Sequence, residues 1–133
     1  MKLTALLCLS TLCASAASAE PIQEGADLFA EACATCHGTD AKGDGPMAKV
    51  MAVQPADLTQ ISLMNDGNFP TARIIRIVDG TTLLTAHGSP MPLFGMLFRG
   101  PSETFVDADG NEFIASRAIG NVVAWIETIQ AEE

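Results

Sequence analysis

The chain has 133 residues, a formal net charge of −9 and an apolar content of 48%. This length suits one domain with a modest buried core, and no internal repeat or low-complexity stretch divides it. The excess of acid makes nucleic acid and anionic membrane surfaces poor partners, whereas a protein with a basic docking face is a suitable one. The alternative is that the acidity serves solubility alone.

Residues 1–19 have the features of a cleaved secretory signal peptide. Lys2 supplies a positive charge, residues 3–13 form an apolar run, and the small residues that follow end in A-S-A, a typical cleavage site. The apolar run is shorter than the roughly 20 residues of a membrane-spanning helix, which disfavours an uncleaved anchor. We therefore expect cleavage after Ala19, export, and one mature domain over residues 20–133.

Helix and loop signals alternate along the first half of this domain. Residues 22–35 carry apolar side chains at helical spacing, and Pro21 stands where a first-turn proline is tolerated. Residues 38–46 combine glycine, aspartate and proline and predict a loop. A short helix is expected over residues 47–53, ended by Pro55.

The second half combines two further helices with a hairpin. We expect a turn at residues 65–68, a helix over 71–78, a loop over 81–96, a small β-hairpin around 107–111 and a helix over 116–129. The fold class is therefore all-α with long loops and a small β-hairpin before the C-terminal helix. Loops of this length in a small domain need something else to pack against.

Signal cleavage also changes the cysteine content. It removes Lys2, Cys8 and Cys13, which leaves 114 residues, a formal net charge of −10 and two cysteines. Residues 33–37 read C-A-T-C-H, the pattern of covalent haem attachment. At this spacing both thiols can reach one porphyrin edge, and the adjacent histidine is placed as the proximal iron ligand.

Two rival interpretations of Cys33, Cys36 and His37 are weaker. A zinc site needs two further ligands at comparable spacing, and the mature chain offers only His87 and no other cysteine. A thioredoxin-like dithiol needs a βαβ context, which the predicted elements lack.

The chain resembles the bacterial-type class I cytochromes c across nearly the whole mature length. The motif C-A-T-C-H-G at 33–38 is the most specific feature, and M-P-L-F-G at 91–95 is similar to the family segment that carries the sixth iron ligand. Gly25 and Phe29 lie where the family packs its first helix against its last, and Trp125 where the last helix usually has an aromatic residue. The resemblance implies a class I cytochrome c fold wrapped around one haem c, attached outside the cytoplasm and hence in the periplasm.

The sixth iron ligand decides between an electron carrier and a haem enzyme or gas sensor with an open site. The candidates in the mature chain are His87, Met47, Met51, Met64, Met91 and Met96. Met47 and Met51 have ordinary core spacing, and Met96 lies among apolar neighbours that suggest packing. Met91 lies between two prolines, in a stiff segment that suits a fixed thioether ligand, and the family resemblance selects the same residue. Ligation by His87 and an open site remain alternatives.

Two further roles are implied around the haem. In resembling cytochromes a proline carbonyl near this position accepts a hydrogen bond from the proximal histidine, which suggests Pro46, nine residues after His37. A plain turn proline is the alternative. Arg73 and Arg76 are candidates for pairing with haem propionates, or they face solvent.

The leading hypothesis is a periplasmic monohaem electron carrier rather than an enzyme. The alternative is a dedicated haem c subunit of a multi-subunit oxidoreductase. Residues 99–116 are longer than the minimal family pattern, and they either dock a fixed partner or are decoration. A haem enzyme or gas sensor is less well supported. A peroxidase in this family would typically want a second C-x-x-C-H motif, and a sensor would want an output domain for which the mature chain has no room.

Overall fold

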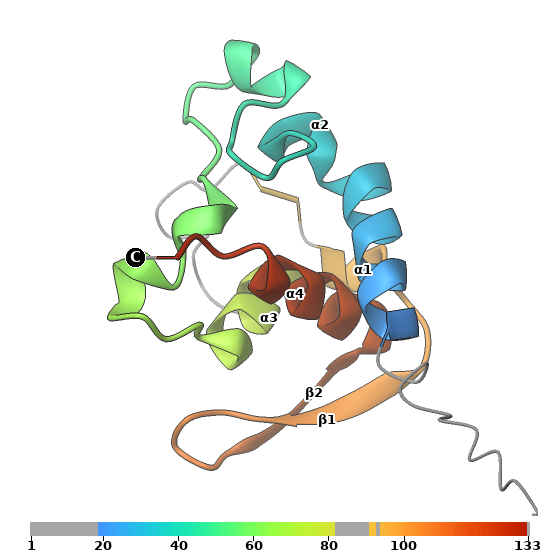
Figure 1. Cartoon of the computed structure of the whole chain (residues 1–133). Helices are drawn as coiled ribbons and strands as arrows, with labels where there is room; N and C mark the ends of the chain where they lie inside the picture. The colour runs from blue at the N-terminus through green and yellow to red at the C-terminus, as the bar shows by residue number, and fades with distance from the viewer. Residues whose placement is uncertain (1–18, 82–90, 93, 133) are drawn as a thin grey trace, which may run out of the picture.

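A computed structural model describes residues 19–81, 91–92 and 94–132, and within them the chain is largely helical with one two-stranded sheet (Figure 1). The elements are α1 (Ala19–Ala32), α2 (Ala34–His37), η1 (Pro46–Val50), η2 (Leu58–Gln60), η3 (Leu63–Asn65), α3 (Thr71–Asp79), η5 (Phe94–Met96), β1 (Ser102–Val106), β2 (Glu112–Ser116) and α4 (Arg117–Thr128). The labels η mark single turns of 3-10 helix. The predicted combination of helices with one hairpin is confirmed.

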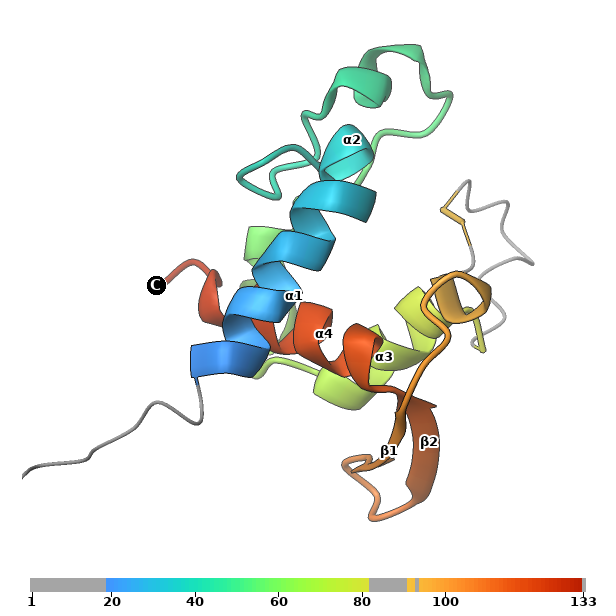
Figure 2. The same cartoon turned by 90° about the vertical axis from the view of Figure 1, so that its right-hand side faces the viewer.

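Helix α4 is the central element, because it contacts both α1 and α3 (Figures 1 and 2). Its buried apolar side chains are at most 2% exposed; they are Ile119, Val122, Val123 and Ile126. These residues recur at helical spacing, as the sequence predicted. The short helix α2 and the β1–β2 hairpin lie at opposite ends of the molecule in both views.

Helices α1 and α4 cross closely at Gly25. A Cβ atom at this position would overlap the Asn121 carbonyl and lie 3.1 Å from the Cβ of Trp125. One turn further along α1, the ring of Phe29 is buried and its centroid lies 4.5 Å from that of Trp125. The Asn121 amide, itself buried, donates a 2.8 Å hydrogen bond to the Glu24 carboxylate. The packing of first helix against last that Gly25 and Phe29 suggested is therefore present.

Helix ends differ from the expected ones by a few residues. The predicted helix over 22–35 is two helices, because regular α1 stops at Ala32 and α2 begins after Cys33. The Ser116 side chain caps α4 by accepting a 3.2 Å hydrogen bond from the Ile119 amide, so that helix begins one residue later than predicted.

The region between α2 and α3 is built from single helical turns. The helix expected over 47–53 is the 3-10 turn η1, which starts at Pro46 and gives way to extended backbone at Met51. Turns η2 and η3 had not been predicted. Asp57 begins η2 by accepting hydrogen bonds from the amide and hydroxyl of Thr59 at 2.9 and 2.6 Å.

The hairpin is longer than predicted and packs on α4 by one face. Strands β1 and β2 are antiparallel, with Phe105 opposite Phe113 and their ring centroids 5.8 Å apart. Phe105 lies against Gly120 of α4, where a Cβ atom would be 2.6 Å from the ring. The other face is open to solvent, with Val106 60% and Ile114 72% exposed.

The crossing at Gly25 gives a direct test of the fold. We expect Gly25→Ala to lower the free energy of unfolding by about 1–3 kcal/mol, because the added methyl group forces α1 away from the α4 backbone. Denaturant unfolding of the haem-loaded protein measures this change. Gly100→Ala is the matched control, since no heavy atom lies within 4 Å of its added Cβ. Equal unfolding midpoints for the two variants would contradict the close crossing.

Candidate functional site

The C-A-T-C-H motif spans the junction of α1 and α2. Cys33 separates the two helices, and α2 contains both Cys36 and His37. Both cysteines are free thiols, Cys33 buried and Cys36 half-buried. The Cys33 carbonyl accepts hydrogen bonds from the amides of Cys36 and His37 at 3.1 and 2.9 Å. This turn brings both sulfur atoms and the imidazole onto one short helical segment.

The loop over residues 38–45 folds back onto α2 through its backbone. The amide of Gly43 donates to the His37 carbonyl at 2.7 Å, and that of Gly45 to the Cys36 carbonyl at 3.1 Å. Gly45 lies so close that a Cβ atom there would be 2.6 Å from the carbonyl oxygens of Ala34 and Thr35. The loop thereby holds the end of α2 in place.

The hydrogen-bond partner of His37 is Ala56, not Pro46. Nδ1 of His37 lies 3.0 Å from the Ala56 carbonyl oxygen, 19 residues along the chain. Pro46 instead begins η1, with its ring at the start of a helical turn. The backbone carbonyl that partners the His37 ring is therefore that of Ala56 and not, as expected, that of Pro46. The interaction itself, between the histidine ring and a backbone carbonyl, is the expected one.

A second loop carries Ala56 to the histidine. The Gln54 side chain donates a 2.7 Å hydrogen bond to the Gly43 carbonyl, and the Leu58 amide donates a 2.8 Å bond to the Ala41 carbonyl. These two bonds tie residues 54–58 to the loop that folds on α2. Sequence reasoning missed Gln54 and Ala56. The only signal was Pro55, a second proline downstream of the motif that could equally mark the carbonyl-bearing loop.

The thiol of Cys33 has the wrong acidity for redox chemistry of its own. Burial, followed by the nearby charge of Cys36, raises the pKa of the Cys33 thiol to about 11. A reactive dithiol motif shifts a cysteine pKa the other way, toward an accessible thiolate. This direction agrees with the preference for haem attachment over a thioredoxin-like dithiol.

Met91 lies on an apolar cluster beside α3. It is half-buried and packs against buried side chains from α3, η5, β2 and α4, namely Ile75, Val78, Phe94, Ala115, Ile119 and Val123. Phe69 packs against this cluster and also against the one that contains Cys33. Phe69 therefore joins the cluster on which Met91 packs to the cluster that contains Cys33. The alternative ligand His87 lies outside the described residues.

The other candidate methionines are in different surroundings. Met47, Met64 and Met96 are 45%, 75% and 65% exposed, and Met51 is half-buried. The expected core position of Met47 and the expected packing of Met96 are thus not found. Among the methionines of the described residues, Met91 alone packs against the apolar cluster beside α3 that contains Ile75 and Val123.

The two arginines of α3 differ. Arg73 is exposed, whereas Arg76 forms a 2.9 Å ion pair with Asp107 and lies 4.4 Å from the ring centroid of Phe113. The partners of Arg76 in the structure lie in the hairpin.

The chemistry of these donors fits a covalently attached haem. Two free thiols and an imidazole share one segment, and the bond from Nδ1 of His37 to Ala56 leaves Nε2 for iron. The Met91 thioether packs on a second apolar cluster, which Phe69 joins to the cluster that contains Cys33. Within residues 19–81, 91–92 and 94–132, no three His, Cys, Asp or Glu side chains gather in a way that could hold a metal ion.

Fold and site together define a small helical protein with one covalent haem-attachment segment. A family model described as cytochrome c matches residues 22–130, and the chain belongs to this family, consistent with the class I resemblance. Membership implies covalently bound haem c and supports a haem-binding electron carrier. Comparisons with curated proteins and with solved structures gave no match. The described helices all fall short of the length and apolarity that a membrane span requires.

The contact between Gly45 and α2 can be tested by one methyl group. Gly45 has a φ of −58°, which alanine adopts without strain, so any effect of Gly45→Ala is steric. We expect a loss of about 1–3 kcal/mol in the free energy of unfolding, because the methyl group meets α2 backbone atoms at 2.6 Å. Denaturant unfolding with Gly100→Ala as reference measures it. An unchanged midpoint would show that the loop does not rest on α2.

Proposed function

We propose that this protein is an exported monohaem electron carrier whose haem c is attached through Cys33 and Cys36, with His37 and Met91 as iron ligands. The observation that carries the proposal is the hydrogen bond from Nδ1 of His37 to the Ala56 carbonyl. It fixes the imidazole ring at the end of the segment that holds both free thiols. A second loop is thus committed to orienting a histidine, which a redox dithiol does not need.

The residues of this chain orient the iron ligands and keep small molecules away from the metal. Haem c, when bound, supplies an iron that changes between the ferrous and ferric states and so takes up or releases one electron. Ala56 holds the His37 ring, and the hydrogen bond raises the basicity of that ligand. Met91 would hold the iron through its thioether sulfur and would favour the ferrous state relative to a second histidine. With both side chains bound to the metal, small molecules such as oxygen and peroxide would have little access to it.

A second candidate function is a dedicated haem subunit of a larger oxidoreductase. The observation that favours it is the outer face of the hairpin, where Val106 and Ile114 are 60% and 72% exposed. Exposed apolar side chains of this size on a small ribbon are a feature of protein contact surfaces. Gel filtration of native extract separates the two functions, since a free carrier elutes near its monomer mass and a subunit elutes with its complex.

Methionine ligation predicts the behaviour of Met91→Ala. The oxidised variant should lose the long-wavelength charge-transfer band of methionine-ligated haem and, once reduced, should bind carbon monoxide. Its reduction potential should fall by a few tenths of a volt, within the roughly 0.8 V range that axial ligands span. Visible spectroscopy and potentiometry measure these changes.

The matched control for Met91→Ala is Met96→Ala. Met96 is 65% exposed and lies five residues away, so its removal should leave band and potential unchanged. If the band persisted in Met91→Ala and disappeared in Met96→Ala, the ligand assignment would be wrong.

Export and the partner form the second part of the proposal. We expect the protein in the periplasmic fraction to begin at Glu20 and to carry one haem, which intact-mass spectrometry measures. Ala19→Gln, which disrupts the cleavage site, should retain residues 1–19. Recovery of wild type with Met1 intact would contradict cleavage.

The formal net charge of −10 after cleavage supports a redox partner with a basic docking face, whose binding weakens as ionic strength rises.

A further inference from the structure

The surface beneath Met91 is assembled from several separate elements. Helix α3 contributes Ile75 and Val78, and the remaining buried side chains come from η5, β2 and α4. The cluster on which the methionine packs therefore depends on how firmly these elements are held to one another.

The chain just after Met91 rests on the end of α3. A Cβ atom at Gly95 would lie 2.5 Å from the Asp79 carbonyl oxygen and 2.6 Å from its side-chain Oδ1. Phe94, one residue earlier, is buried and stacks on Phe98 with ring centroids 5.5 Å apart. A displacement of α3 would therefore be passed directly to the methionine segment.

Arg76, three residues before Asp79, connects α3 to the hairpin. Its guanidinium donates a 2.9 Å hydrogen bond to Asp107 and lies 4.4 Å from the ring centroid of Phe113. The Asp107 side chain is 11% exposed and that of Arg76 is 35% exposed, so the ion pair is partly shielded from water. Arg76 and then the Asn111 amide hold the pKa of Asp107 down to about 2, so this carboxylate stays charged near neutral pH.

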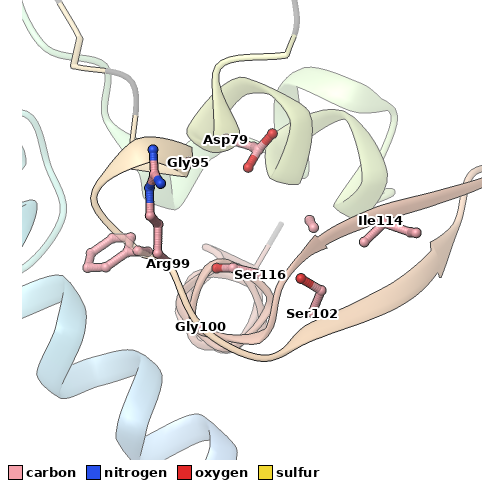
Figure 3. A pocket seen from close by; sticks show the side chains of 9 residues that line it. Asp79, Gly95, Arg99, Gly100, Ser102, Ile114 and Ser116 are labelled. Atoms are coloured by element: carbon pink, nitrogen blue, oxygen red, sulfur yellow. The ribbon is translucent and has the colours of Figure 1, made fainter.

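The face of the hairpin that carries Phe113 is also anchored to α4. Phe105 packs on Gly120, and Ala115 of β2 belongs to the cluster beneath Met91. Between the hairpin, the η5 segment and the end of α3 lies a solvent-open hollow of about 260 Å³, lined in part by Asp79, Gly95 and Ser116 (Figure 3). Beside this hollow, the Arg76 contacts join α3 to the hairpin in addition to the apolar packing of Ile75 and Val78 with Ala115.

We propose that Arg76 and Asp107 are positioning residues for the methionine ligand, and that the hairpin braces α3 against α4 beneath Met91. The inference rests on the proposed function, since it takes Met91 as the iron ligand. Loss of the ion pair frees α3 to shift. The bond between Met91 and the iron then costs less free energy to break. An added ligand that competes for the same axial position then binds more tightly.

The test uses the hairpin's two ion pairs as a matched set. Asp107→Asn removes the ion pair to α3 while keeping a side-chain oxygen for the turn. Glu103→Gln removes the ion pair to Arg117, in which the Arg117 side chain is 54% and the Glu103 side chain 43% exposed. Imidazole is titrated into the oxidised, haem-loaded protein while the methionine charge-transfer band is followed. We expect Asp107→Asn to lower the apparent Kd for imidazole by about threefold to tenfold and Glu103→Gln to change it less than about twofold.

The outcomes separate the brace from the ligand assignment. Equal shifts in Asp107→Asn and Glu103→Gln, or no shift in the former, would overturn the brace. If Asp107→Asn yields no folded protein, Arg76→Lys keeps the charge but loses the planar stacked group, and it should shift the Kd in the same direction. An unchanged Kd in Arg76→Lys would then overturn the brace. Failure of the ligand assignment shows separately, as a charge-transfer band that survives in Met91→Ala.

Discussion

The close crossing of α1 and α4 at Gly25 is the contact on which the other elements depend. It lets the backbones approach until a Cβ atom at Gly25 would overlap the α4 backbone, and it places the tilted ring of Phe29 against Trp125 beside that point. One end of α1 leads into Cys33, and the residues of α4 beyond the crossing form part of the surface under Met91. A single helix contact thus sets the relation between the two ends of the candidate site.

The site itself is held mainly by backbone hydrogen bonds rather than by a core of its own. The carbonyls of Cys36, His37 and Ala56 are all engaged, in each case across a loop rather than within a helix. The two bonds between the loop and α2 depend on chain path more than on side-chain identity, and glycine is needed where the backbones touch, as at Gly45, or where φ is positive, as at Gly43. This explains how a domain with such long loops can still fix the orientation of one histidine ring.

The elements that the sequence predicted are set by neighbouring residues, whereas the contacts that it missed are set by the path of the chain. Helices α3 and α4 and the hairpin were predicted because apolar periodicity and turn residues act over a few neighbouring positions. The partner of His37 was assigned to Pro46 because resembling cytochromes use a proline carbonyl near that position, and nothing in the local pattern favours a carbonyl 19 residues away. The 3-10 turn at Leu58–Gln60 was missed for a related reason, since its cap is one aspartate within a stretch that lacks periodicity.

The hairpin makes contacts that join it to α3 and α4 of this small domain. A two-stranded ribbon is marginally stable alone, so β1 and β2 depend on Phe105 against Gly120 and on the contacts of Arg76. Coupling of this kind is reciprocal, since each contact stabilises both of the elements it joins. If the hairpin favours one position of α3 beneath Met91, then whatever holds Met91 at its axial position stabilises the hairpin by the same free energy. On the proposed function, the hairpin is then part of what keeps Met91 in place.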